Sequence, residues 1–119
     1  MDPNLYFVFS QKPDWVSRDD YHAWYVDHAQ ENIESPGFLS AQRYVTREVQ
    51  NGRAVAEEQH LCVYGYDGDM QTWRDDLTRR IQSGDVVLKE WHHDIAFRSW
   101  DCHPVGNLLR PARLTGGGR

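Results

Sequence analysis

The sequence lacks the long apolar run that a membrane span or a secretory signal requires. After the acidic start Met1-Asp2-Pro3-Asn4, the first apolar run covers only residues 5–9. A membrane-spanning helix needs about 18 apolar residues, and a signal core needs at least about seven. Cysteine is also scarce: Cys62 and Cys102 are too few for the disulfide framework of a small secreted domain. We therefore expect a cytoplasmic protein with free thiols.

Basic charge is in short supply too. Lys and Arg total 13 against 18 Asp and Glu, which gives a net charge of −5. Nucleic acids are bound by basic faces and anionic membranes by polybasic segments, so we expect no nucleic-acid and no membrane partner. The sequence also has no glycine-rich phosphate loop and no G-x-S-x-G nucleophile motif, which argues against nucleotide-dependent chemistry.

Aromatic side chains, in contrast, are abundant. They make up 13% of the 119 residues and include five Trp and six Tyr. A chain of this length fits one domain that can bury a core without disulfides or metal. The aromatic content fits a ligand cavity or a subunit interface, or else a core that simply uses aromatic residues.

The apolar periodicity changes between steps of two and steps of three or four along the chain. It predicts six elements, in the order strand 5–9, helix 17–33, strand 38–49, strand 53–66, helix 70–82 and strand 91–100. Asn51-Gly52 between the two central strands is a strong hairpin signal. The order β-α-β-β-α-β predicts a ferredoxin-like α+β fold over 1–103. Residues 104–119 are expected to form a tail, partly disordered or docked on a partner subunit.

One antiparallel sheet with two helices on one face leaves its other face bare. We expect Tyr6, Tyr64 and other aromatic side chains on that uncovered side. A second copy of the chain is the usual cover for such a face, so the sequence predicts a homodimer with cavities between sheet and helices.

The first helix places an imidazole beside aromatic rings. Tyr21, Trp24, Tyr25 and His28 share one face because they follow each other at steps of three and four. His28 is then either a core histidine with satisfied ring nitrogens or a general acid/base kept neutral by apolar neighbours.

The hairpin brings polar side chains onto one face of the sheet. A two-residue turn at Asn51-Gly52 makes paired positions sum to 103, with Arg43 opposite His60 and the same face shared by all of these pairs. The further pairs are Ala41 with Cys62 and Leu39 with Tyr64. Arg43 and His60 form either an anion or carbonyl site or a pair at the solvent rim.

The sequence offers little for a metal. In a strand His92 and His93 point to opposite faces, so both cannot bind one ion, and we expect no metal site. We expect His93 to face the cavity, in phase with Ile95 and Phe97. An aromatic cavity with inward histidines has room for haem in principle, but nothing in the spacing specifies it.

Three segments resemble one protein family. They are residues 21–28, 35–44 and 64–69, which read YHAWYVDH, SPGFLSAQRY and YGYDGD. Together they resemble the EthD-like branch of the dimeric α+β barrel superfamily over about residues 1–100. The resemblance implies a ferredoxin-like homodimer with one cavity per subunit. The acid-Pro pair that usually follows the histidine in that branch is absent here, where the sequence after His28 reads Ala29-Gln30-Glu31-Asn32.

The resemblance also implies chemistry. Relatives include cofactor-free muconolactone-type isomerases, polyketide cyclases and dehydratases, quinone-forming monooxygenases and haem-degrading enzymes. An inward histidine of the first helix lies in the site of several of them, which corresponds to His28 here. The tyrosine, histidine and cysteine of the isomerases correspond loosely to Tyr44, His60 and Cys62.

We therefore expect a cofactor-independent isomerase, cyclase or lyase acting on an aromatic, lactone or polyketide-like molecule. His28 is the predicted base, and His60 or His93 donates to the developing oxyanion together with Tyr64. The remaining candidates contact the substrate, namely Trp24, Arg43, Tyr44, Cys62 and Tyr6. The alternatives are a cofactor-free or haem-dependent monooxygenase of the same fold and a non-catalytic small-molecule-binding module.

Overall fold

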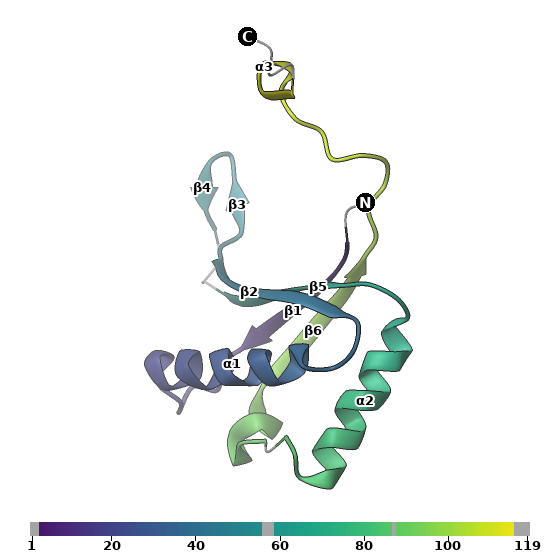
Figure 1. Ribbon diagram of the computed structural model, residues 1–119. Coiled ribbons are helices and arrows are strands. Elements are labelled where there is room, and N and C mark those ends of the chain that lie inside the picture. Colours follow the sequence, from purple (N-terminus) through teal and green to yellow (C-terminus); the bar gives the residue numbers. More distant parts are fainter. Residues whose placement is uncertain (1–2, 56–58, 87, 116–119) are drawn as a thin grey trace.

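The computed structural model describes residues 3–55, 59–86 and 88–115. Its elements (Figure 1) are β1 (Asn4–Gln11), α1 (Arg18–Ile33), β2 (Phe38–Thr46), β3 (Val49–Gln50), β4 (Arg53–Ala54), β5 (Gln59–Tyr66), α2 (Met70–Ser83), the 3-10 helix η1 (Glu90–Asp94), β6 (Ala96–Cys102) and α3 (Ala112–Thr115). None of the helices in the described residues is long and apolar enough to cross a membrane.

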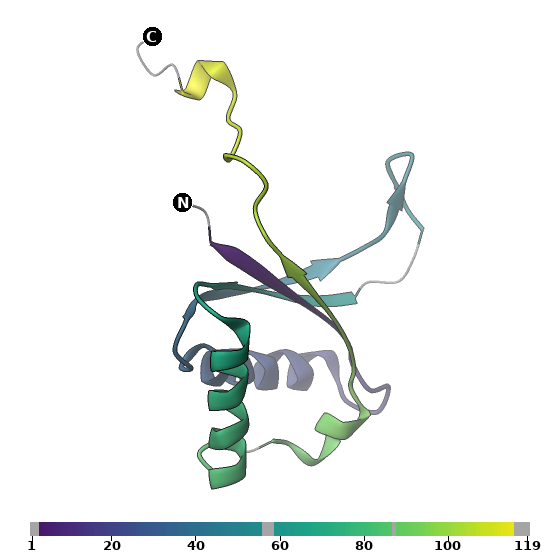
Figure 2. The same cartoon turned by 90° about the vertical axis from the view of Figure 1, so that its right-hand side faces the viewer.

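Four strands form one antiparallel sheet in the order β2-β5-β1-β6, and β3 pairs with β4 in a separate two-stranded arm. Both views place α1 and α2 on the same side of the sheet (Figures 1 and 2). This strand order with both helices on one face is the ferredoxin-like α+β arrangement that the element order predicted.

Local signals in the sequence fix where the two long helices begin and end. Ser17 accepts a hydrogen bond from the Asp20 backbone N–H at the start of α1, and Asp69 accepts one from Gln71 at the start of α2. Gly84 ends α2 in the left-handed conformation. The predicted helices at 17–33 and 70–82 are therefore confirmed to within a residue.

The Asn51-Gly52 turn has two residues, as expected, but the register of the sheet differs from the prediction. Asn51 and Gly52 adopt φ angles of 52° and 77°, as a type I′ turn requires. At the tip Gln50 pairs with Arg53, whereas in the sheet Arg43 pairs with Cys62 instead of His60. The prediction was wrong because the returning chain has two more residues than the outgoing chain between these two blocks of pairs.

A shift by two residues leaves the alternation of faces unchanged. Ala41, Arg43, His60, Cys62 and Tyr64 therefore share one face, as predicted. The bulge between Phe38 and Ser40 breaks this pattern for Leu39, which lies beside Gly65 on the opposite face.

The aromatic core lies between α1 and the sheet. Tyr21, Tyr25 and Cys62 are fully buried there, and Tyr64 is 3% exposed. The expectation that Tyr6 and Tyr64 lie on the uncovered face was wrong, because the pleat turns both rings toward the helices, where they lie 6.4 Å apart.

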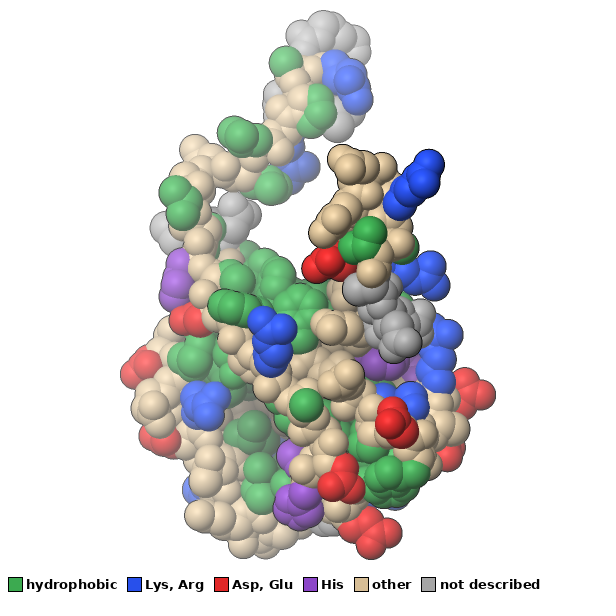
Figure 3. Space-filling model, turned by 180° about the vertical axis from the view of Figure 1, so that it is seen from behind, with side chains coloured by type: hydrophobic (Ala, Val, Ile, Leu, Met, Phe, Trp, Pro, Cys, Tyr) green, Lys and Arg blue, Asp and Glu red, His purple; other side chains and the backbone are tan. Residues whose placement is uncertain are grey.

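The uncovered face is apolar even so. It carries Leu39, Tyr44 and Trp100, which are 56%, 50% and 52% exposed. In the described part of the chain no helix lies over this face (Figures 1 and 2), and Figure 3 shows apolar side chains gathered between the hairpin arm and the tail.

The end of the domain departs from the predicted strand 91–100. Residues 90–94 form η1, and β6 begins only at Ala96. The tail that follows extends away from the body on the same side as the β3–β4 arm (Figure 1) and contains the short helix α3. The prediction of disorder at the chain end falls mainly on residues 116–119, which lie outside the described residues.

Candidate active site

A cavity of about 300 Å³ lies between the sheet, α1, α2 and the segment around η1. Its volume is at the lower end of small-molecule pockets. Apolar and aromatic side chains make up most of its wall, and a few polar groups converge on it. The lining residues are Tyr6, Val8, Tyr25, His28, Asn32, Phe38, Tyr64, Trp73, Arg74, Leu77, Ile81, Leu88, His92, Phe97 and Ser99.

His28 presents its imidazole to this cavity from α1. One ring face stacks on Trp24, with centroids 4.7 Å apart and planes 16° apart, and Tyr25 packs edge-on at 5.7 Å. Burial, together with the neighbouring imidazole of His92, lowers the pKa of His28 from 6.5 to about 4. The ring is therefore neutral at pH 7 and can accept a proton.

Asn32 lies one helical turn after His28 and links it to the sheet. Its amide nitrogen donates to the Tyr64 hydroxyl at 3.0 Å and lies 3.4 Å from Nε2 of His28. Its carbonyl oxygen Oδ1 is buried without a hydrogen-bond partner among the described residues. An unpartnered buried acceptor in a cavity wall is a place where a ligand donor or a water belongs.

Two phenols line the closed side of the cavity. Burial raises the pKa of both Tyr25 and Tyr64 far above 10, so both remain protonated donors. The Tyr64 oxygen accepts from Asn32 while its own proton points to the Cys62 sulfur, so Tyr64 can donate to a ligand when its proton turns from Cys62 toward the cavity. The Tyr25 hydroxyl is also buried without a partner of hydrogen-bonding geometry in the described chain.

The second imidazole of the site comes from His92 and not from the predicted His93. His92 lines the cavity with its ring 5.7 Å from that of His28, and burial lowers its pKa. His93 is exposed and does not line the cavity. The prediction failed because residues 90–94 form a 3-10 helix, so the alternation of a strand does not apply to them.

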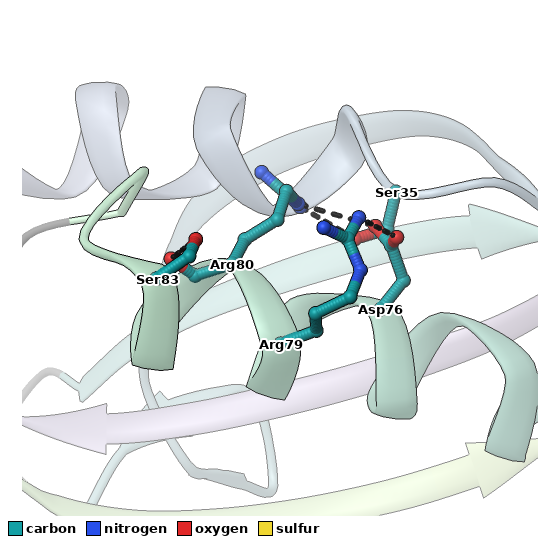
Figure 4. A network of polar contacts seen from close by, with 5 residues as sticks. All are labelled: Ser35, Asp76, Arg79, Arg80 and Ser83. Atoms are coloured by element: carbon teal, nitrogen blue, oxygen red, sulfur yellow. Dashed lines mark hydrogen bonds and ion pairs between the residues drawn. The ribbon is translucent and has the colours of Figure 1, made fainter.

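Helix α2 supplies the remaining wall. It is held in place by aromatic contacts of Trp73 and by hydrogen bonds of Arg80, which we call the Arg80 latch. Trp73 packs on Phe38 and Tyr6, with centroids 4.5 and 5.3 Å away. Further along α2, Arg80 donates to Asp76 on its own helix and to Ser35 beyond the end of α1 (Figure 4). This latch connects the two helices that enclose the cavity.

Arg43 and His60 meet as the sequence predicted, but not in the cavity. The Arg43 guanidinium lies 3.3 Å from Nδ1 of His60, contacts the His22 imidazole and carbonyl, and stacks over the Tyr25 ring at 4.5 Å. Because α1 covers this part of the face, the pair joins helix to sheet, and neither residue lines the cavity.

Three other candidates also lie outside the cavity wall. Tyr44 is half-exposed on the uncovered face because of the strand alternation. Cys62 is fully buried, and burial raises the pKa of its thiol. Trp24 stacks on the His28 ring but does not itself line the cavity. Of the predicted residues, His28, Tyr64 and Tyr6 line the cavity.

Sequence reasoning missed Asn32, His92, Trp73 and Arg74. The signal for Asn32 was present, because residue 32 continues the stripe of Tyr25 and His28 by one more step of four. Trp73 and Arg74 belong to α2, which the sequence predicted as a helix without connecting it to the site. Within the described residues no group of three or more His, Cys, Asp and Glu side chains could hold a metal ion.

Comparisons with known proteins assign no family to the chain. No family model and no curated protein matches the chain. Among solved structures, a putative monooxygenase from Shewanella loihica matches with a TM-score of 0.49 and 9% identity, over 90% of this chain and 99% of that chain.

Proposed function

We propose that the chain is a cofactor-independent enzyme of the EthD-like branch that moves a proton on a small aromatic or enolisable molecule. The observation that supports this most directly is the neutral His28 imidazole, which opens into an apolar cavity while Trp24 and Asn32 hold its ring. Apolar walls with a few convergent polar groups and a perturbed titratable group are typical of such sites.

The pKa of His28 decides which substrates are plausible. A phenol has a pKa of about 10, roughly six units above the pKa of about 4 of the His28 imidazolium. Proton transfer from a phenol to His28 is therefore uphill by about 8 kcal/mol. Attraction between the imidazolium and the new anion offsets part of this cost, and donors at the developing oxyanion offset more. Tyr25 and Tyr64 are the donors on the closed side.

The reaction needs no oxidant. His28 takes a proton from a C–H or O–H bond of the substrate, and the electron pair moves to a carbonyl or ring oxygen facing the phenols. In an isomerase the imidazolium returns the proton to another carbon. In a lyase it protonates the leaving group as the carbon–leaving-group bond breaks, and in a cyclase it protonates the alkoxide formed when the carbanion attacks a second carbonyl. In each case the imidazole ends neutral and ready for another cycle.

Deuterium uptake tests this without knowledge of the natural substrate. Enolisable lactones, cyclic ketones and hydroxyaromatic compounds are incubated with the protein in heavy water, and exchange at carbon is followed by NMR. We expect exchange with at least one class and a loss of about 10²–10⁴-fold in the His28→Ala variant. His93→Gln, which removes an exposed histidine outside the cavity, is the matched control and should keep the wild-type rate.

The other functions considered from the sequence give different results in the same experiment. Oxygen consumption with a hydroxyaromatic probe, without deuterium exchange, would indicate a cofactor-free monooxygenase. Binding with neither exchange nor oxygen consumption would indicate a binding module. Either result would contradict the proposed proton transfer.

The cavity residues do not fit haem. A volume of about 300 Å³ suits one or two rings better than a porphyrin, and both cavity imidazoles pack against other rings. A Soret band on titration with haem would contradict this assessment.

The proposal includes a homodimer that covers the bare sheet face. Leu39 and Tyr44 on β2 and Trp100 on β6 are exposed apolar side chains on this face, and exposed apolar faces on a stable protein are normally interfaces. The β3–β4 arm and the tail rise on either side of this face (Figures 1 and 3), so a second copy would sit between them.

A further inference from the structure

The cavity combines unpartnered polar atoms on its closed side with a cation on its open side. The Tyr25 hydroxyl and Asn32 Oδ1 belong to side chains that are 1% and 8% exposed, and neither atom has a partner in the described chain. The Ser10 oxygen accepts from Tyr21 at 2.6 Å and its own proton can point toward the Tyr25 oxygen, which acts to lower the Tyr25 pKa, but the Tyr25 proton is still left without an acceptor. Polar atoms buried in this way carry a cost that a ligand oxygen would remove.

The open side carries Arg74 from α2. Its side chain is exposed at the cavity mouth, where it reaches the Tyr6 hydroxyl at 3.4 Å and lies 6.0 Å from the Trp73 ring. No ion pair engages this guanidinium among the described residues, in contrast to Arg79 and Arg80 on the same helix, which both bind Asp76. Arg74 is therefore available for a ligand.

The permanent charge in the described cavity wall is positive. No Asp, Glu or Lys lines the cavity in the described chain, and Arg74 carries the permanent charge there. The protein as a whole has a net charge of −5, which repels anions at long range. A preference for an anionic ligand therefore has to come from Arg74, at short range.

We infer that the cavity takes a small aromatic carboxylate with a second oxygen. The carboxylate pairs with Arg74 at the mouth, the ring lies among the aromatic side chains, and a hydroxyl or carbonyl oxygen reaches Tyr25 and Asn32 on the closed side. Tyr25 can donate to a carbonyl, and Asn32 Oδ1 can accept from a hydroxyl. This inference names the substrate class for the proposed proton transfer and rests on that proposal for its biological meaning.

Four naphthalene probes separate the contributions by calorimetry. The first carries a hydroxyl on one ring and a carboxylate on the other, the second lacks the hydroxyl, the third lacks the carboxylate, and the fourth has an aminomethyl group in place of the carboxylate. We expect the first to bind most tightly and the fourth most weakly. Salt at about 1 M should weaken the carboxylate probes more than the neutral one.

Three variants, one of them a control, assign these differences in affinity to residues. Arg74→Gln should weaken both carboxylate probes by about tenfold and leave the neutral probe unchanged. Arg79→Gln changes the net charge equally from outside the cavity wall and should leave all four affinities unchanged. Tyr25→Phe should weaken the hydroxyl probes about fivefold to tenfold and raise the unfolding midpoint of the free protein, because it removes an unpartnered buried hydroxyl.

The outcomes distinguish this inference from the proposed function. If the probes bind without preference for the carboxylate, or if Arg74→Gln and Arg79→Gln behave alike, the inference is wrong and proton transfer by His28 is untouched. If no probe binds, the inference is wrong, and the deuterium-exchange experiment decides separately on proton transfer by His28. A Tyr25→Phe variant that loses stability would show that the hydroxyl serves the fold, and it would overturn its role toward a ligand.

Discussion

The His28 imidazole lies nearly parallel to the Trp24 indole, 4.7 Å away and tilted by 16°. The two residues are one helical turn apart on α1, so the helix itself sets the stacking. The indole covers one face of the imidazole and shields it from water, while the other face remains toward the cavity. This contact helps to hold the imidazole and contributes to the burial that, together with His92, keeps it neutral.

The buried imidazole makes stability depend on pH. The pKa of His28 is about 4 in the folded protein and 6.5 without its surroundings, so between these values the unfolded chain binds a proton that the folded protein does not. Stability is therefore complete above pH 6.5 and falls as the pH drops toward 4. The lowered pKa of His92 acts in the same direction.

We expect the free energy of unfolding to fall by about 2 kcal/mol through His28 between about pH 7.5 and pH 5. Urea titrations of the wild type and of His28→Gln at both pH values measure this. The variant should lose clearly less stability over the same interval. An equal loss in both proteins would mean that His28 titrates in the folded protein as it does in water.

The fold was largely predictable because its signals are local. Ser17 and Asp69 as caps, the Asn51-Gly52 turn and the periodicity of each segment give element type and order without knowledge of distant contacts. The exact register was not predictable, since it depends on how many residues the arm holds outside the sheet. The 3-10 helix was missed because Trp91-His92-His93 has no pattern that separates it from a strand.

The site was less predictable because it depends on how deeply each side chain is buried beneath the helices. Spacing correctly placed Arg43 and His60 on the same face as Tyr64. It could not tell that this is the helix side of the sheet, or that α1 covers Arg43 and His60 while leaving Tyr64 open to the cavity. The distance of α2 from the sheet, which creates the cavity, is set by packing of Trp73 and by the Arg80 latch. Neither feature appears in the sequence as a motif.

Gly37 is required where the two connecting turns meet. Its φ is +99°, and a methyl group at its Cα would come within 2.9 Å of the Asp67 carbonyl oxygen, while its own carbonyl accepts from the Asp67 N–H at 2.8 Å. We expect Gly37→Ala to lower the free energy of unfolding by about 3 kcal/mol or more, from backbone strain and the clash together. Chemical denaturation measures it.

Gly52 provides the matched control for this substitution. It also has a positive φ of +77°, but a methyl group there would meet nothing within 4 Å. Gly52→Ala should therefore cost only the conformational part, about 1 kcal/mol. If the two variants lose the same stability, the contact between Gly37 and the Asp67 carbonyl does not matter.

Arg43 should prove important for stability and unimportant for turnover. Its guanidinium binds His22 and His60 and stacks on the Tyr25 ring, and Arg43 itself does not line the cavity. We expect Arg43→Met to destabilise the protein by about 2 kcal/mol, and Arg43→Lys by less, because lysine keeps the charge and loses the fork. Denaturation and deuterium exchange on the same samples measure both properties. A variant that folds stably and loses exchange would instead place Arg43 against the substrate.

The proposed dimer can be tested by substituting Trp100, the exposed tryptophan of the sheet. Trp100 is 52% exposed on β6, and a two-fold interface over this face would bury it in both copies. A charge there would be desolvated twice, so Trp100→Glu should raise the dimer dissociation constant at least about a hundredfold. Sedimentation over a range of concentrations measures it. Trp15→Glu alters a tryptophan that is 65% exposed in the loop after β1 and should leave the dimer intact. A wild-type protein that stays monomeric at all concentrations, or equal weakening by both variants, would show that this face is not the interface.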